Sequence, residues 1–376
     1  MALIRSGSIF SSTIFDDLQS LDEASKLELI SKLWPESGLT SKAFIEDDYT
    51  AFIGYIGREF SKLRGHQHKF ASNTLDTTLE LIEFIRTTSD QPQTAVLQKA
   101  RERFQGVDEA AVLRSLELAA RLWLTINLHS SSIAVGPIQP SVGAVEWPQC
   151  LSLNDTVRKA FTYLGRVRET ASDENELSGY RNLAFTAASL NKRSGIRFFW
   201  TDNLTDHLYF DKQRRTLTVY QHKICLLNHR KDPRSPILQA VLLETIDTLN
   251  LLFPVGHEST RELLRREDKM SLLGLGHCDR PHLVDLEDYR VWKAQLADLV
   301  EVFNEPPRNL SQLLSDNRNV KDLTNIWIGL LVLVLTVVTL AFGTISSVYG
   351  IKQYELSLAQ ACLMQDAAKL LPKFCK

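Results

Sequence analysis

A short polar run between two predicted strands carries the residue types best suited to binding or catalysis. Trp200 is followed by Thr-Asp-Asn-Leu-Thr-Asp and then by His207. Loops that rigid strands hold in place often carry function, so this run is a candidate pocket or contact surface. The alternative is turn chemistry, in which Asp and Asn side chains hydrogen-bond to nearby backbone amides. Under the functional interpretation, the candidate residues are Trp200, Asp202, Asn203 and His207.

Possible metal ligands are present, but their spacing does not match a common metal site. They lie in the segments His66-Gln-His68 and His277-Cys278-Asp-Arg-Pro-His282. Neither segment supplies a second pair of cysteines, and neither has the His-x-x-x-His spacing that puts two imidazoles on one face of a helix. We therefore expect no metal site.

Sequence motifs for nucleotide binding and covalent catalysis are missing. Gly274-Leu-Gly276 lacks the third glycine and the preceding strand of a dinucleotide fingerprint, and no Gly-Lys-Ser/Thr phosphate loop occurs. The chain has no Gly-x-Ser-x-Gly elbow, and no cysteine stands in a recognisable nucleophile setting. We expect no catalytic residue of a recognisable type and no cofactor.

Composition and charge are those of an ordinary globular chain. Of the 376 residues, 44% are hydrophobic and 23% are charged, which argues against disorder, a collagen-like fibre and a disulfide scaffold. The net charge is -2, so no positive field favours nucleic acid as a partner. Five scattered cysteines suit a reducing compartment. Because residues 1–13 lack the apolar stretch of a signal peptide, we expect the main domain in the cytosol.

An uncharged segment near the carboxyl end is long enough to cross a membrane. About 20 apolar residues in a helix span a hydrocarbon layer of roughly 30 Å, and a helix satisfies its own backbone hydrogen bonds there. Trp327 and Tyr349 lie near the ends of this segment, where amphipathic rings prefer the membrane interface. We expect a single transmembrane helix over residues 323–350. The alternative is a buried helix of a soluble protein.

The charges around this segment favour one orientation slightly. Arg308, Arg318 and Lys321 lie on its amino-terminal side, against Lys352 and the distant Lys369 on the other side. The positive-inside rule therefore places residues 1–322 in the cytosol. With so short a tail, insertion after translation is expected, and the organelle stays open.

The predicted span and the tail each carry a further pattern. Gly343, Ser346, Ser347 and Gly350 are spaced as one stripe of a helix, which could let a second membrane helix approach closely. Small residues are also common in membrane helices in general. Residues 352–376 repeat Leu and Ala among polar residues, which predicts an amphipathic helix on the far membrane face.

Apolar periodicity predicts a mainly helical chain before the span. The predicted helices cover residues 15–34, 40–63, 73–85, 94–104, 107–128, 153–167, 176–191, 237–253, 259–273 and 286–303. Residues 107–128 are apolar around nearly the whole circumference, as in a central core helix. Glycines and prolines over 131–149 predict a linker between an N-terminal helical region, 1–130, and a second helical region, 150–315.

The pattern changes to that of a small sheet after residue 195. Residues 196–200 form an aromatic strand, and residues 207–210 and 216–220 flank a turn. We expect an antiparallel β-hairpin or three-stranded sheet over about residues 195–221, with helices on one face. The predicted fold class is mainly α with this small sheet and a single C-terminal transmembrane helix.

Three stretches resemble an uncharacterised family of filamentous-fungal membrane proteins. They are Arg-Leu-Trp-Leu-Thr-Ile-Asn at 121–127, the Trp-Thr-Asp-Asn loop at 200–208, and Asn-Arg-Asn at 317–319 leading into the span. The resemblance covers about residues 115–350. It implies a fungal source and a C-terminal membrane anchor, but no catalytic residue. A role near specialised-metabolite biosynthesis would be an association and not a mechanism.

Two hypotheses about function follow. A full-sized domain with an anchor and no catalytic constellation favours a membrane-anchored interaction or scaffold protein. Its expected partners are the lipid bilayer and either another protein or a second copy of the chain. The alternative is an enzyme or accessory factor that acts on a membrane-soluble metabolite through the residues around 202–207.

Overall fold

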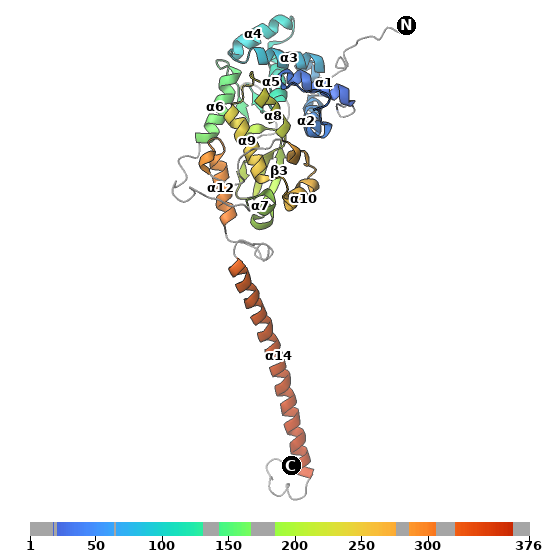
Figure 1. The fold of residues 1–376 in the computed structure, drawn as a ribbon, viewed down its shortest axis with the longest axis vertical. Coiled ribbons are helices and arrows are strands. Elements are labelled where there is room, and N and C mark those ends of the chain that lie inside the picture. Colours follow the sequence, from blue (N-terminus) through green and yellow to red (C-terminus); the bar gives the residue numbers. More distant parts are fainter. Residues whose placement is uncertain are drawn as a thin grey trace, which may run out of the picture. The chain divides into compact units, whose positions relative to one another are not determined.

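The computed structural model describes residues 18, 21–63, 65–130, 143–166, 185–275, 286–305 and 320–363. The chain divides into two compact units, Met1–Pro306 and Pro307–Lys376. The fold is mostly helical, with small sheets of two and three strands and one long apolar helix near the carboxyl end (Figure 1). The predicted fold class is confirmed.

Five helices form the amino-terminal part of the first unit. They are α1 (Glu23–Leu33), α2 (Glu46–Leu63), α3 (Leu75–Thr87), α4 (Gln93–Arg103) and α5 (Glu109–Leu124). Local signals fix their ends: Asp22 caps α1 by accepting the Ser25 N–H at 3.1 Å, and Thr74 and Thr77 form a capping box at α3. Helices α1, α2 and α5 lie within the predicted ranges, α3 ends two residues after its predicted range, and α4 begins one residue before its predicted range.

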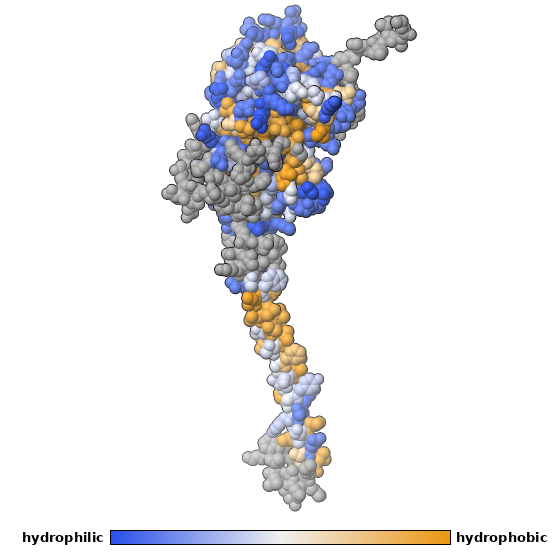
Figure 2. Space-filling view, in the orientation of Figure 1, coloured by the Kyte–Doolittle hydropathy of each residue, from blue (hydrophilic) through white to orange (hydrophobic). Residues whose placement is uncertain are grey.

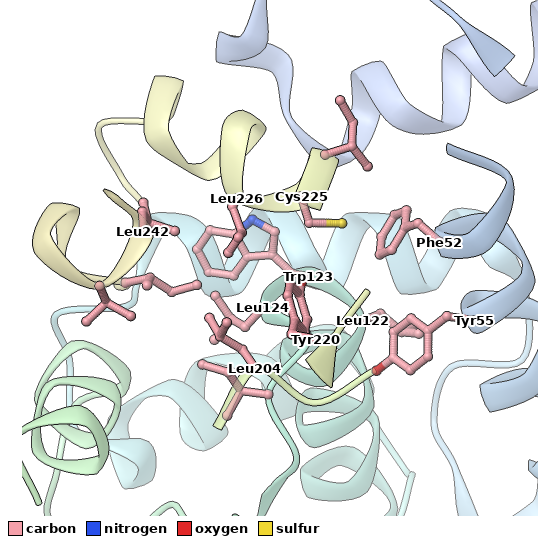
Figure 3. Close-up of a cluster of buried hydrophobic side chains, with 14 of the residues drawn as sticks. Phe52, Tyr55, Leu122, Trp123, Leu124, Leu204, Tyr220, Cys225, Leu226 and Leu242 are labelled. Carbon is pink, nitrogen blue, oxygen red and sulfur yellow. The ribbon is translucent and has the colours of Figure 1, made fainter. Parts of the chain in front are cut away.

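Helix α5 is the central helix, as predicted from its continuous apolar surface. It packs against α3 and α4, and its last residues, Leu122, Trp123 and Leu124, are fully buried. Figure 3 shows these side chains meeting Tyr220 and Leu242, which belong to distant parts of the sequence. The carboxyl end of α5 is therefore the point where the two halves of the first unit pack together.

A pair of two-residue strands follows α5. Strand β1 (Leu128–His129) pairs in parallel with β2 (Val145–Glu146), and the pairing was not predicted. Residues 131–142, most of the predicted linker, lie outside the described residues. The described chain resumes at Gly143, and Trp147 is 1% exposed.

The predicted three-stranded sheet is present, but its strand order corrects one expectation. It contains β3 (Arg197–Thr201), β4 (Phe210–Asp211) and β5 (Thr216–Tyr220) in the order β3-β5-β4. Strands β4 and β5 form the expected antiparallel hairpin. Strand β3 pairs with β5 in parallel, so the antiparallel expectation was wrong for β3. The connection formed by residues 202–209 is too long for a tight turn. It carries the chain from β3 to β4 across the width of one strand, so β5 fits between the two.

Within the described residues, seven further α-helices of the first unit follow β2. They are α6 (Leu153–Arg166), α7 (Ala187–Ser194), α8 (Lys223–Lys231), α9 (Gln239–Leu252), α10 (Glu258–Arg266), α11 (Ser271–Gly274) and α12 (Lys293–Asn304). Helix α8 was not predicted, because its apolar residues are consecutive rather than helically spaced. The single helix predicted over 259–273 is divided at Asp268, whose φ is +55°; a left-handed residue ends a helix.

The second unit contains helix α14 (Val320–Leu363). Its candidate membrane span is Trp327–Leu363, and the most apolar 18-residue window of this span has a mean hydropathy of 2.6 and no buried share. Apolar residues dominate α14 beyond its first turns, and polar residues become frequent toward its carboxyl end (Figure 2). The helix is long and apolar enough to cross a membrane. Residues 364–376 of the predicted amphipathic tail lie outside the described residues.

Candidate functional site

The predicted loop joins β3 to β4 and includes a short 3-10 helix, Leu204–Asp206. The loop is fixed to the core by the buried Leu204, whose N–H donates to the Thr125 carbonyl at 2.8 Å. The candidate side chains do not converge on one cavity. Trp200 packs against Phe253 with ring centroids 5.8 Å apart, whereas the three polar residues make separate networks.

Asp202 lies at the centre of a charged cluster. Its Oδ1 accepts from the Arg58 guanidinium at 2.9 Å, from Gln221 Nε2 at 2.6 Å and from His222 Nε2 at 2.8 Å. Burial alone would raise the pKa of Asp202. Hydrogen bonds from His222 and Arg58, together with the positive charge of Arg58, instead hold this pKa well below its usual range. The cluster therefore joins α2, the loop and the end of β5 through an ionised carboxylate.

His222 forms the inner wall of this cluster. It is 1% exposed, and its ring lies 5.8 Å from Phe52, 5.6 Å from Tyr55 and 5.6 Å from Tyr220, measured between centroids. Burial lowers the pKa of His222, although Asp202 opposes the shift. Because Asp202 is ionised and can only accept, the proton of the neutral ring lies on Nε2. Nδ1 has no hydrogen-bond partner among the residues that the structure describes.

Three loop side chains, those of Asn203, Thr205 and Asp206, form hydrogen bonds with the backbone of Gly143. The Gly143 N–H donates to Asp206 Oδ1 at 2.8 Å, and the Gly143 carbonyl accepts from Asn203 Nδ2 at 3.3 Å and from the Thr205 hydroxyl. Asn203 Oδ1 also accepts the Asn127 N–H at 3.0 Å. Burial raises the pKa of Asp206. These hydrogen bonds join loop side chains to backbone groups, but the backbone groups belong to Asn127 and Gly143, which lie far from the loop in sequence.

Gly143 should be the least replaceable glycine among those described. A Cβ at this position would lie 2.6 Å from both Asp206 Oδ1 and Thr205 Oγ1, so Gly143→Ala should lower the free energy of unfolding by about 1–3 kcal/mol through overpacking. The matched control is Gly57→Ala in α2, where a Cβ meets nothing within 4 Å. That change should be neutral or stabilising by roughly 0.5–1 kcal/mol. Equal urea midpoints for the two variants would contradict the prediction.

His207 points into the core and not toward Asp202. Its Nδ1 accepts the Tyr220 N–H at 3.3 Å, so Nε2 carries the proton and donates to Thr248 Oγ1 of α9 at 2.8 Å. The ring meets Trp292 edge-on with centroids 5.0 Å apart. Burial lowers the pKa of His207 to about 3. Both ring nitrogens are thus engaged in holding β5 and α9 together.

The four small residues of the predicted membrane stripe lie on α14. Within the helix, the Ser347 hydroxyl donates to the Gly343 carbonyl at 2.9 Å. A Cβ at Gly343 or Gly350 would meet nothing within 4 Å, and Ser346 and Ser347 are exposed. The helical spacing is as expected, and the contact with a second helix stays a prediction.

Comparison with known proteins adds no identification. No family model matches the chain, and neither a curated protein nor a solved structure shows significant similarity to it. Function must therefore be argued from the residues themselves.

The described residues offer limited means for holding a metal or a small molecule. Across the described ranges, no group of three or more His, Cys, Asp or Glu side chains is placed to bind a metal ion; His277, Cys278 and His282 lie outside them. A cleft of about 380 Å³ lies between α7 and α10 and is lined by Lys192 and Glu262, among others. None of the four predicted loop residues lines it.

Sequence reasoning missed the residues that complete the loop's networks. Gln221 and His222 contact Asp202 because the parallel register pairs Thr201 with Tyr220, and Arg58 reaches Asp202 from α2. The residues that follow these two strands therefore meet at one edge of the sheet. Recognising the parallel pairing would have brought Gln221 and His222 to Asp202, but no local pattern points to Arg58.

Proposed function

We propose that this protein is a single-pass, membrane-anchored interaction or scaffold protein. The observation that carries the proposal is α14, whose candidate span of 37 residues exceeds the roughly 20 apolar residues needed to cross a bilayer. Trp327 begins that span, as expected of an aromatic residue at a membrane interface. The chain thus joins a folded unit to a segment suited to lipid.

The arrangement of the 200–207 loop supports a binding role for the first unit. Asp202, Asn203 and His207 tie the loop to α2, to Gly143 and to α9. A loop fixed at three points presents a stable surface, and binding to such a pre-organised surface costs little ordering entropy. The proposed partners are cytosolic proteins held at the membrane.

The cysteines support a cytosolic position for the first unit. Cys150 and Cys225 are free thiols. Disulfides persist in oxidising compartments and are rare in the cytosol, so free thiols fit a first unit on the cytosolic side of the membrane.

Membrane anchoring can be tested by placing charge in the apolar window. A charged side chain at the centre of a membrane helix costs about 2.5–3.5 kcal/mol on insertion scales. We expect the full chain to remain with membranes in alkaline carbonate and to float with vesicles. The variant Leu335→Lys with Leu340→Lys should shift to the soluble fraction, and the matched pair Leu335→Ala with Leu340→Ala should not. Release of the unmodified chain by carbonate would refute the anchor.

The scaffold role requires a separate experiment. Proximity labelling with the full chain should enrich a defined set of cytosolic proteins over a control that carries only residues 307–376. If the two profiles coincide, the first unit recruits no partner and the proposal fails. If only proteins on the non-cytosolic side of the membrane were labelled, the orientation would be the opposite of the one proposed.

One observation favours a second candidate, an enzyme acting on a membrane-soluble metabolite. The Asp202 side chain is 31% exposed while it bonds to the buried His222, and a carboxylate–imidazole pair can transfer protons. Asp202→Asn would keep the shape and remove the charge. If metabolite profiles stay unchanged in a strain where deletion alters them, with protein abundance equal by immunoblot, this candidate is refuted.

A further inference from the structure

Strand β3 is an edge of its three-stranded sheet, with β5 on one side only. The Arg197 N–H donates to the Arg215 carbonyl at 2.9 Å, and the Thr201 carbonyl accepts the Gln221 N–H at 3.2 Å. Residues 197, 199 and 201 thus direct their backbone groups toward β5, and the alternate residues, Phe198 and Trp200, direct theirs away. Within the part of the chain that the structure describes, those outward N–H and C=O groups have no partner.

The side chains of β3 give this edge of the sheet little of the usual protection against pairing with another strand. Phe198 and Trp200 pack inward against Phe253, with centroid distances of 6.2 and 5.8 Å. Phe199 points to the opposite face and is 57% exposed. Exposed edges are normally protected by charges, prolines or bulges. The sequence Arg-Phe-Phe-Trp-Thr has one charge, at its start, and no proline.

We propose that β3 pairs antiparallel with β3 of a second copy, about a two-fold axis at Phe199. In this register Phe198 lies opposite the second copy's Trp200, and each such pair exchanges two backbone hydrogen bonds. Phe199 then lies opposite the second copy's Phe199 in a non-hydrogen-bonded pair, where side chains approach most closely. The two three-stranded sheets become one continuous six-stranded sheet with a stacked aromatic pair on its open face.

The strand is self-complementary, which selects a second copy over an unrelated peptide. Centring the pairing on Phe199 satisfies the outward groups of both strands without a bulge. Arg197 faces the second copy's Thr201, so the two arginines are not directly opposed, and like charges directly opposite would be unfavourable. An isologous contact of this kind closes as a dimer and does not propagate into a fibre.

The small size of the contact makes pairing depend on the membrane. Two five-residue strands bury less than the roughly 1,200 Å² of a stable interface. Copies that are anchored in the same bilayer meet at a high effective concentration, which compensates for a weak contact. This step rests on the membrane anchoring proposed above. Dimerisation is therefore expected in vesicles and is expected to weaken on dilution into detergent.

Cysteine cross-linking of the full chain in phosphatidylcholine vesicles tests the pairing. In a Cys150→Ser background, Phe199→Cys should form an interchain disulfide under mild oxidation, because opposite Cβ atoms lie roughly 4.5–5.5 Å apart. Ile45→Cys is the matched control, since Ile45 is 58% exposed and lies before α2. Cross-linking at 199 should be about tenfold faster than at 45 if the geometry is held. Equal rates would mean random collision and would overturn the proposal.

The register supplies a second, independent readout. Mixed copies carrying Arg197→Cys and Thr201→Cys should cross-link to each other, and Arg197→Cys alone should not. Adding Phe199→Lys, an exposed change that leaves the bonds to β5 in place, should abolish the mixed product. Cross-linking of Arg197→Cys alone at the mixed rate would exclude this antiparallel register.

Flotation of the same samples separates this proposal from the proposed anchoring. If the chain floats with the vesicles and position 199 cross-links no faster than position 45, the pairing is wrong and the anchor stands. If the chain neither floats nor cross-links at 199, both are wrong. Rapid cross-linking at 199 without flotation would support the pairing and refute its dependence on the membrane.

Discussion

Asp232→Asn should lower the free energy of unfolding by about 3 kcal/mol, the lower end of the range for breaking a buried ion pair. The side chains of Asp232 and Arg86 are 0% and 3% exposed, and Oδ2 lies 4.0 Å from the guanidinium NH1. Within the described ranges, Arg86 Nε and NH1 have no hydrogen-bond partner, so the neutral amide would leave a poorly compensated buried cation. Glu83 still bonds to Arg86, which limits the loss.

The matched control is an exposed ion pair with better geometry. Arg101 and Glu109 are 2.7 Å apart, with side chains 55% and 56% exposed. Glu109→Gln should change stability by less than about 1 kcal/mol, because water screens exposed pairs. Urea unfolding of the full chain in detergent, followed by tryptophan fluorescence, measures both variants. A larger effect at Glu109 than at Asp232 would show that burial does not set the cost.

A double variant tests the physical cause further. Arg86→Met removes the cation that Asp232 balances, so Arg86→Met with Asp232→Asn should be less destabilised than the sum of the single changes. Additive losses would mean that the two side chains act independently. Arg86 lies in α3 and Asp232 directly follows α8, so the pair joins two distant parts of the first unit.

The features predicted from sequence are those that local residues determine. The continuous apolar surface of α5, the alternation along β5 and the uncharged run of α14 are all visible within about 20 residues. Capping residues such as Asp22 and Thr74 add to the same local signal. These elements form where the pattern predicts them because each must bury one apolar surface.

The features that were not predicted depend on contacts across the sequence. Arg58 reaches Asp202 over 144 positions, and Asp206 reaches Gly143 over 63. No periodicity records such pairings. The parallel partner of β3 is equally non-local, because it depends on where the chain goes after Thr201. Residues of an irregular loop also point in different directions, so Asp202 and His207 are neighbours in sequence without sharing a site.

Mild acid should destabilise the protein through its buried histidines. Burial lowers the pKa of His207 to about 3 and that of His229 to about 4, although the Trp123 carbonyl bonded to His229 opposes the second shift. Below the unfolded value of about 6.5, the unfolded chain takes up protons that the folded rings refuse. Stability is therefore fully present above that pH and falls as the pH drops. At pH 5 each ring should account for a loss of about 2 kcal/mol relative to pH 7.

Replacing one ring isolates its contribution from those of other groups. Burial raises the pKa of Glu117 and of Asp206, and these acids oppose the histidines by taking up protons first in the folded state. His207→Gln should be less stable than the parent at pH 7, because it loses the bond to Thr248, yet it should lose about 2 kcal/mol less between pH 7 and pH 5. The exposed His68 is the control, and His68→Gln should keep the parent's pH slope. Parallel stability curves for the parent and His207→Gln would show that the ring is protonated in the folded state, in conflict with the network of Tyr220, His207 and Thr248.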